Sequence, residues 1–204
     1  MPFAPRLSLY LIACAAALGL AGCNNYKGVP DPVVSSKDAE WMALVPKFDV
    51  DLQYERYEIA DPMGEQPGTV IVDTSERFLY FVLPNKKAIR YGVAVGDEAF
   101  GWTGEAAIQR KAEWPRWTPP AEMIARWPHL APRAGGMEGG PDNPLGARAL
   151  YLYQNGHDTL YRIHGTNEPE TIGHNVSSGC IRLRNEDVMD LYERVRVGTK
   201  VVVI

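Results

Sequence analysis

Short apolar runs separated by turn residues constrain the fold of this chain more than any other feature of the sequence. The run from Arg77 to Leu83 is apolar on both alternating faces, which is typical of a strand buried on both sides. Residues 84–87 read as a turn, so the run from Ala88 to Val95 predicts the second strand of a hairpin. The 19 glycines and 16 prolines favour short strands joined by turns over a helical bundle.

The same pattern continues along the second half of the chain. Further strands are predicted at residues 69–73, 105–111, 147–153, 159–164 and 200–204. One helix is predicted from Asn185, which reads as its N-cap, to Gly198, which closes it. Its apolar face is formed by Val188, Leu191, Tyr192 and Val195. We therefore expect a mostly β fold with one helix near its end.

A long segment between these strands breaks the pattern. Seven prolines within residues 114–144 exclude long regular elements and leave room for one short helix at residues 120–127. Such a long loop inside a compact domain is usually functional or mobile. Its tryptophans have two equal interpretations, contact with a substrate or anchoring of the loop to the core, and they are Trp114, Trp117 and Trp127.

The segment from His164 to Asn185 carries most of the residues with catalytic chemistry. Cys180 lies between a glycine and an apolar residue, and His164 precedes it by sixteen residues at the end of a predicted strand. Arg182 follows the cysteine by two residues. This is the layout of a nucleophile, a base and a binding site for an anion.

These blocks resemble the L,D-transpeptidases with a YkuD-type catalytic domain. The resemblance rests on the sequence I-H-G-T-N-E-P around His164, on S-x-G-C-I-R-L-x-N around Cys180 and on the length between them. It extends from about Thr69 to the C-terminus, and it implies a YkuD-like β-sandwich or barrel domain over residues 68–204. It also implies that the long loop forms a wall beside the active site. Ser178 departs from the family, which often has histidine there.

The resemblance implies a role for each residue near the cysteine. Cys180 is the nucleophile and His164 the base, in preference to His174, which lies in the loop between the two blocks. The carbonyl of Gly165 would accept the other ring N–H and fix the tautomer of the imidazole.

The backbone N–H groups of Gly179 and Cys180 would form an oxyanion hole. Arg182 would bind a substrate carboxylate, with a salt bridge inside the motif as the alternative. Asn167 and Ser177 complete the predicted substrate-binding set.

The implied reaction joins peptidoglycan stems. The cysteine would attack a tetrapeptide stem at its third residue, release D-Ala and form a thioester. An amine of a second stem would then give a 3–3 cross-link, and an amine of an envelope protein would attach that protein to the wall. Water as the acceptor would make the protein an L,D-carboxypeptidase, and a catalytically inactive wall-binding lipoprotein is the other alternative. A thiol redox protein would normally show a C-x-x-C pair, which is absent.

Composition excludes several other classes of protein. A net charge of −4 gives no general attraction to nucleic acid. The four histidines show no metal-ligand spacing, so neither a metal nor a cofactor is expected.

The N-terminus predicts export. Residues 1–23 combine a basic start, a short apolar run and the sequence L-A-G-C, which resembles a lipoprotein signal in which Cys23 is lipidated. We expect a periplasmic, lipid-anchored protein, and Asn24 after the cysteine favours the outer membrane. Residues 24–67 are predicted to be a tether or docking arm, either loosely packed or partly docked through residues 39–57.

Overall fold

The structure is a computed structural model that describes residues 26–96, 102–177 and 179–204. The predicted signal peptide, Cys23 and Ser178 lie outside the described residues.

A ten-stranded sheet forms most of the molecule, in the order β1-β2-β5-β4-β3-β12-β7-β8-β9-β11, and β10 and β6 pair separately. The strands are β1 (Lys27–Gly28), β2 (Tyr57–Ala60), β3 (Val70–Asp73), β4 (Phe78–Leu83), β5 (Lys87–Gly92), β6 (Val95–Gly96), β7 (Gly104–Glu113), β8 (Arg148–Gln154), β9 (His157–His164), β10 (Asn175–Ser177), β11 (Ile181–Arg182) and β12 (Lys200–Val203). The helices are α1 (Ser36–Met42), α2 (Ala121–Arg126) and α3 (Asn185–Arg194), with short 3-10 turns η1 (Leu52–Tyr54), η3 (Pro128–Arg133) and η4 (Pro169–Thr171).

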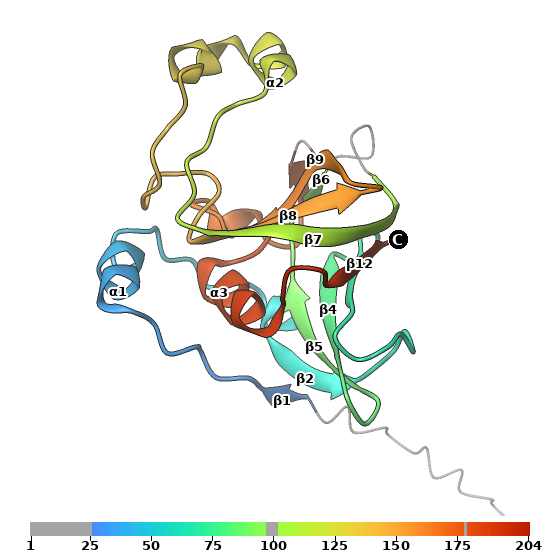
Figure 1. The fold of residues 1–204 in the computed structure, drawn as a ribbon. Coiled ribbons are helices and arrows are strands. Elements are labelled where there is room, and N and C mark those ends of the chain that lie inside the picture. The colour runs from blue at the N-terminus through green and yellow to red at the C-terminus, as the bar shows by residue number, and fades with distance from the viewer. Residues whose placement is uncertain (1–25, 97–101, 178) are drawn as a thin grey trace, which may run out of the picture.

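The last strand joins the two halves of this sheet. β12 pairs in parallel with β3 and antiparallel with β7. The half containing β7, β8 and β9 therefore lies over the half containing β2, β5 and β4, with α3 beside them (Figure 1). The expectation of a mostly β domain with one helix after the nucleophile motif is confirmed.

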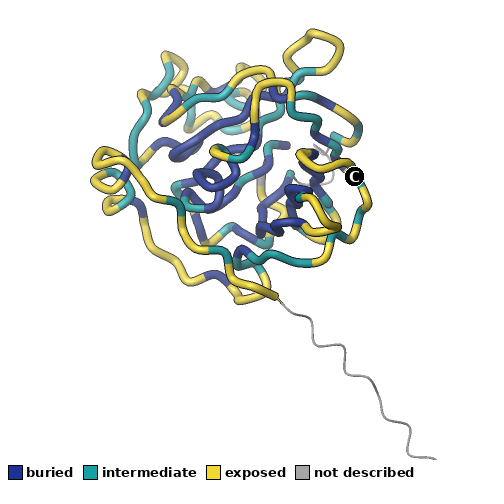
Figure 2. Tube along the Cα trace, turned by 60° about the horizontal axis from the view of Figure 1, so that its bottom comes forward, coloured by how far each residue is buried: buried dark blue, intermediate teal, exposed yellow. Residues whose placement is uncertain are grey.

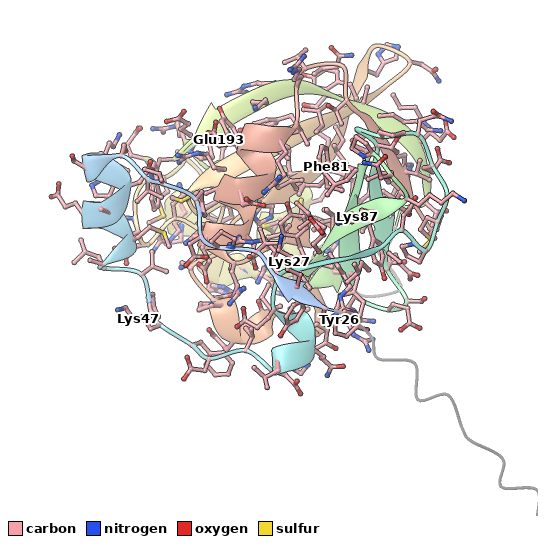
Figure 3. All side chains as sticks on the ribbon, turned by 90° about the horizontal axis from the view of Figure 1, so that it is seen from below. Tyr26, Lys27, Lys47, Phe81, Lys87 and Glu193 are labelled. Carbon is pink, nitrogen blue, oxygen red and sulfur yellow. The ribbon has the colours of Figure 1, made fainter. Side chains whose placement is uncertain are left out.

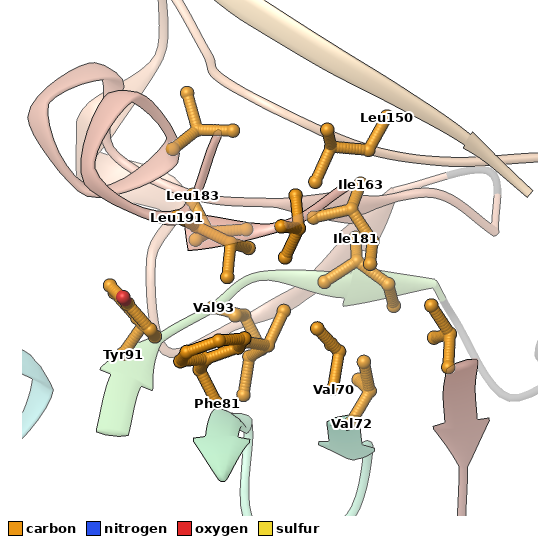
Figure 4. Close-up of a cluster of buried hydrophobic side chains, with 14 of the residues drawn as sticks. Val70, Val72, Phe81, Tyr91, Val93, Leu150, Ile163, Ile181, Leu183 and Leu191 are labelled. Carbon is orange, nitrogen blue, oxygen red and sulfur yellow. The ribbon is translucent and has the colours of Figure 1, made fainter. Parts of the chain in front are cut away.

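One hydrophobic core fills the space between the two halves. Its side chains come from both layers and from α3, and they include Val70, Phe81, Tyr91, Leu150, Ile163, Ile181 and Leu191 (Figure 4). The tube in Figure 2 shows these segments as buried stretches surrounded by exposed turns. Because Ile163 and Ile181 flank His164 and Cys180 in sequence, core packing fixes the backbone that carries both residues.

The predicted hairpin of β4 and β5 is present. Asn85 and Lys86 take φ values of 62° and 56°, which are left-handed conformations suited to a tight turn. The second strand ends at Gly92 instead of Val95, which begins the separate strand β6.

Two predictions about the ends of the final helix are wrong. Helix α3 has Arg184 at its N-cap position, and Asn185 is its first residue. The Asn185 side chain accepts from the N–H of Ala147 at 2.8 Å and donates to the carbonyl of Thr166 at 2.9 Å, so it joins two loops and caps nothing. The helix ends at Arg194, and Gly198, with φ of 93°, turns the chain towards β12.

The described part of the predicted arm, residues 26–67, docks on this domain and adds β1 and β2 to its sheet. Strand β1 pairs with β2, and the chain then crosses to α1 before returning through Lys47 (Figure 3). The buried guanidinium of Arg56 donates to Asp187 at 2.8 Å, and Glu55 accepts two hydrogen bonds from Arg184. The arm is expected from the sequence to be either loosely packed or partly docked, and these contacts are those of a docked segment.

Candidate active site

A cavity of about 350 Å³ brings together the residues that the motif singled out. It is lined by Trp117, Met123, Trp127, His129, Leu130, Pro144, Leu145, His164, Glu168, Val176, Cys180 and Arg182. The cavity therefore contains a thiol, an imidazole and a guanidinium together with apolar side chains from the long loop.

Strand pairing sets the relative positions of these groups. β11 runs parallel to β9, with Ile181 opposite Ile163 and Arg182 opposite His164. Cys180 immediately precedes β11, where the chain comes from β10. The backbone N–H of Arg162 donates to the sulfur of Cys180, so the thiol is held against strand β9.

The ring of His164 is fixed by its neighbour in the chain. Nδ1 lies 2.5 Å from the carbonyl oxygen of Gly165, and since a carbonyl only accepts, Nδ1 carries the hydrogen. The neutral ring then has its lone pair on Nε2. Position 165 has no room for a side chain, because a Cβ there would lie 2.2 Å from the Asn185 Oδ1.

The electrostatics of the site favour neutral groups. Burial, followed by the positive charge of Arg182, lowers the pKa of His164 to about 3, although the Gly165 carbonyl opposes this shift. Burial raises the pKa of the Cys180 thiol, against the N–H of Arg162 and the charges of Arg162 and Arg182. We therefore expect a neutral thiol beside a neutral imidazole in the resting protein, not a preformed thiolate–imidazolium pair.

The turn before Cys180 has a backbone conformation that requires glycine at position 179. Gly179 is buried with φ of 118°, in the left-handed region that a side chain would strain. It also packs against Gly96, where a Cβ would lie 2.7 Å from the Gly179 Cα. The candidate oxyanion-hole residues Gly179 and Cys180 thus lie on a closely packed turn at the cavity.

Arg182 has a partner inside the cavity. Its Nη1 donates to Glu168 Oε2 at 2.8 Å, and about half of the Glu168 side chain (52%) is exposed. Asn167 is not among the lining residues; its Nδ2 donates to the carbonyl of Asp142 at 3.2 Å and joins the two loops. Ser177 lies in β10, and its side chain is outside the described residues, whereas its neighbour Val176 lines the cavity.

The three tryptophans of the long loop divide between their two interpretations. Trp117 and Trp127 line the cavity, whereas Trp114 is buried against the arm, with its ring 5.0 Å from that of Trp41. His174 is exposed and is not a lining residue of this cavity.

A second cavity of about 220 Å³ also reaches the thiol. Cys180 and Met123 line both cavities, and the second one continues past Arg126 to Leu160. Helix α2, which carries Met123, therefore borders both of the cavities that Cys180 lines.

Several residues of the site were missed from the sequence alone, among them Arg162, Glu168 and Met123. Arg162 could have been found, because it lies two residues before His164 and so on the same face of a strand. Glu168 lies within the I-H-G-T-N-E-P motif, but only the structure shows its contact with Arg182. Met123 has no sequence signal, because the path of a proline-rich loop does not follow from a pattern.

Residues 67–203 match the family described as the L,D-transpeptidase catalytic domain (YkuD). The chain belongs to this family. It is 40% identical over 139 residues to the probable L,D-transpeptidase YbiS of Escherichia coli, a match that covers 66% of this chain and 43% of YbiS. The chain thus spans less than half the length of this relative.

Two solved structures show the same likeness. A Brucella melitensis protein described as a probable carnitine operon oxidoreductase is 50% identical, with a TM-score of 0.52, over 76% of this chain and 96% of that one. An L,D-transpeptidase from Mycobacterium smegmatis has a TM-score of 0.50 at 18% identity, over 67% of this chain and 58% of that one, and so shows the shared fold alone.

The reactivity of Cys180 should follow an ionisation at high pH. Because both pKa shifts favour the neutral pair, iodoacetamide should alkylate the thiol about tenfold faster per pH unit from pH 6 to 9. The measurement is the alkylation rate by mass spectrometry. A rate that stays constant from pH 4 to 8 would show a preformed ion pair and contradict this account.

Proposed function

We propose that this protein is a periplasmic L,D-transpeptidase that acts on peptidoglycan tetrapeptide stems through a thioacyl intermediate on Cys180. One observation carries the proposal: Cys180 and His164 line one cavity, and the Gly165 carbonyl holds the His164 ring as a neutral base. Family membership supports the reaction class, and the geometry supports the role proposed for each group.

The first half of the reaction forms the thioester. Cys180 Sγ attacks the carbonyl carbon of the third stem residue while its proton passes to His164 Nε2. Because thiol and imidazole are both neutral at rest, this transfer accompanies the attack. The N–H groups of Gly179 and Cys180 stabilise the oxyanion, a contribution of about 3–4 kcal/mol for each donor in other enzymes. The C–N bond then breaks, and D-Ala leaves with the proton from His164.

The second half transfers the acyl group to an amine. The acceptor amine attacks the thioester carbonyl and gives its proton to His164. The C–S bond then breaks, and His164 returns the proton to the Cys180 sulfur. Two cavities that share Cys180 support this order, because donor and acceptor can approach one sulfur from different sides of Met123. The products are 3–3 cross-links or an envelope protein attached to the wall. Hydrolysis by an L,D-carboxypeptidase and inactive wall binding are the alternatives.

Turnover of purified muropeptides tests the reaction. We expect loss of D-Ala and a 3–3 dimer by mass spectrometry, and a carbapenem should add one mass at Cys180. Cys180→Ser should abolish turnover, and His164→Ala should slow acylation about 10²- to 10⁴-fold. The exposed His174→Ala is the matched control and should resemble the wild type. A tripeptide without a dimer would identify a carboxypeptidase, and no D-Ala release would favour the wall-binding alternative.

Arg182 is proposed to bind the carboxylate of the stem. Arg182→Lys keeps the charge but loses the planar fork, so kcat/KM should fall about tenfold while alkylation of Cys180 changes little. Glu168→Gln should instead lower KM, because it removes a carboxylate that competes for the same guanidinium. If alkylation falls together with turnover in Arg182→Lys, the arginine shapes the motif and does not bind the stem.

We propose that lipidation of Cys23 anchors the protein, with the outer membrane as the destination. Strand β1 begins at Lys27, so three residues would separate the lipidated Cys23 from the folded domain, and the chain from Cys23 to Lys27 can span at most about 14 Å. Cys23→Ala should release the protein from the membrane fraction or block its processing. Unchanged fractionation, together with an unlipidated mass for the wild type, would refute the anchor. No helix among the described residues is long and apolar enough to cross a bilayer.

A further inference from the structure

A buried carboxylate of the arm lies outside the region matched by the family. Asp38, in α1, is 4% exposed, and the family match begins only at residue 67. Its Oδ1 accepts from Arg148 Nη1 at 2.9 Å and from Trp114 Nε1 at 2.8 Å, and its Oδ2 accepts from Arg148 Nη2 at 2.9 Å. Arg148 holds the pKa of Asp38 well below its usual range, so the carboxylate is charged at neutral pH.

One branch from Asp38 leads to the catalytic base. Arg148 begins β8, and its carbonyl accepts from the N–H of Gly165 at 3.0 Å. The carbonyl of Gly165 in turn accepts from Nδ1 of His164 at 2.5 Å. The ion pair with Asp38 fixes the side chain of Arg148, which also donates to the adjacent Ala147 carbonyl at 2.8 Å. Asp38 therefore stabilises the strand end that holds the backbone of Gly165, whose carbonyl orients the base.

The other branch leads to the wall of the cavity. Trp114 is buried with φ of 40°, and its N–H donates to the carbonyl of Ala147 at 2.8 Å. It is the first residue of the long loop, which also supplies Trp117, Met123, Trp127, His129, Leu130 and Pro144 to the cavity. The indole hydrogen bond to Asp38 thus fixes the point where this wall leaves β7.

Asp38 is the only carboxylate that pairs with Arg148 among the ion pairs of residues 26–96, 102–177 and 179–204. Arg148 is 6% exposed, so loss of Asp38 would leave a buried guanidinium uncompensated. Release of α1 from Arg148 and Trp114 is the expected response of the structure, and both branches would then loosen together.

We propose that Asp38 is a positioning residue, through which the docked arm orients His164 and holds the wall of the active site. This inference rests on the proposed function for its effect on stem turnover, but its effect on the Cys180–His164 pair does not depend on the substrate. The charges of Arg162 and Arg182 act on the His164 ring, and the other titratable groups that line the same cavity are those of Glu168, Cys180 and His129.

Asp38→Asn in the full chain tests the proposal, with Glu40→Gln as the control, because Glu40 is an exposed acid on the same helix. We expect kcat on tetrapeptide stems to fall about tenfold and KM to rise, since small misplacements of catalytic groups are costly. A less buried His164 should also become easier to protonate. The acid limb of kcat/KM should therefore move up by about one pH unit, and alkylation of Cys180 below pH 8 should become faster.

Two further variants separate the branches and keep the test decisive if Asp38→Asn does not fold. Trp114→Phe removes the indole N–H together with one ring of the side chain and leaves the Asp38–Arg148 pair in place, so KM should rise with an unchanged acid limb. Arg148→Lys loses the paired contact with Asp38, so the acid limb should move with a smaller change in KM. Values of kcat, KM and acid limb in all three variants that match Glu40→Gln would overturn the proposal. If the wild type turns over no stem, the proposed function fails, while the alkylation profile still decides the role of Asp38.

Discussion

The hydrogen bond from His164 Nδ1 to the Gly165 carbonyl is the interaction on which the site depends. It assigns the lone pair to Nε2, and it exists because glycine lets the backbone come close to Asn185. The backbone N–H of the same residue, Gly165, donates to the carbonyl of Arg148 at the start of β8. The direction of one imidazole is therefore set by strand pairing, by a loop-bridging asparagine and by the arm that holds Arg148.

Burial of the site has two opposing effects on the proposed reaction. A shielded cavity strengthens the hydrogen bonds that stabilise an oxyanion, but it raises the free energy of a thiolate and of an imidazolium. The neutral pair that we expect from this burial would avoid a reactive thiolate at rest and make attack depend on a substrate carbonyl. The positive charges of Arg162 and Arg182 then favour the anion that forms during attack.

Much of the fold and of the candidate site could be predicted from the sequence, because strands and turns have local sequence signals. The hairpin at Asn85, the core strands and the meeting of Cys180 with His164 all follow from patterns within a few residues or from the family motif. Asn185 was mistaken for an N-cap, since its long-range partners Ala147 and Thr166 leave no local signal. The docking of Asp38 could not be predicted for the same reason. The sequence of a short helix in a polar arm carries no signal for a buried partner 110 residues away.

The protonation state of the His164 ring is the most direct test of whether the Gly165 carbonyl holds this residue as a neutral base. Long-range proton–nitrogen NMR on the protein with labelled histidine distinguishes the two neutral tautomers from the imidazolium. The account predicts a neutral ring with its hydrogen on Nδ1 from pH 8 down to pH 5. A hydrogen on Nε2, or a doubly protonated ring near pH 6.5, would contradict it.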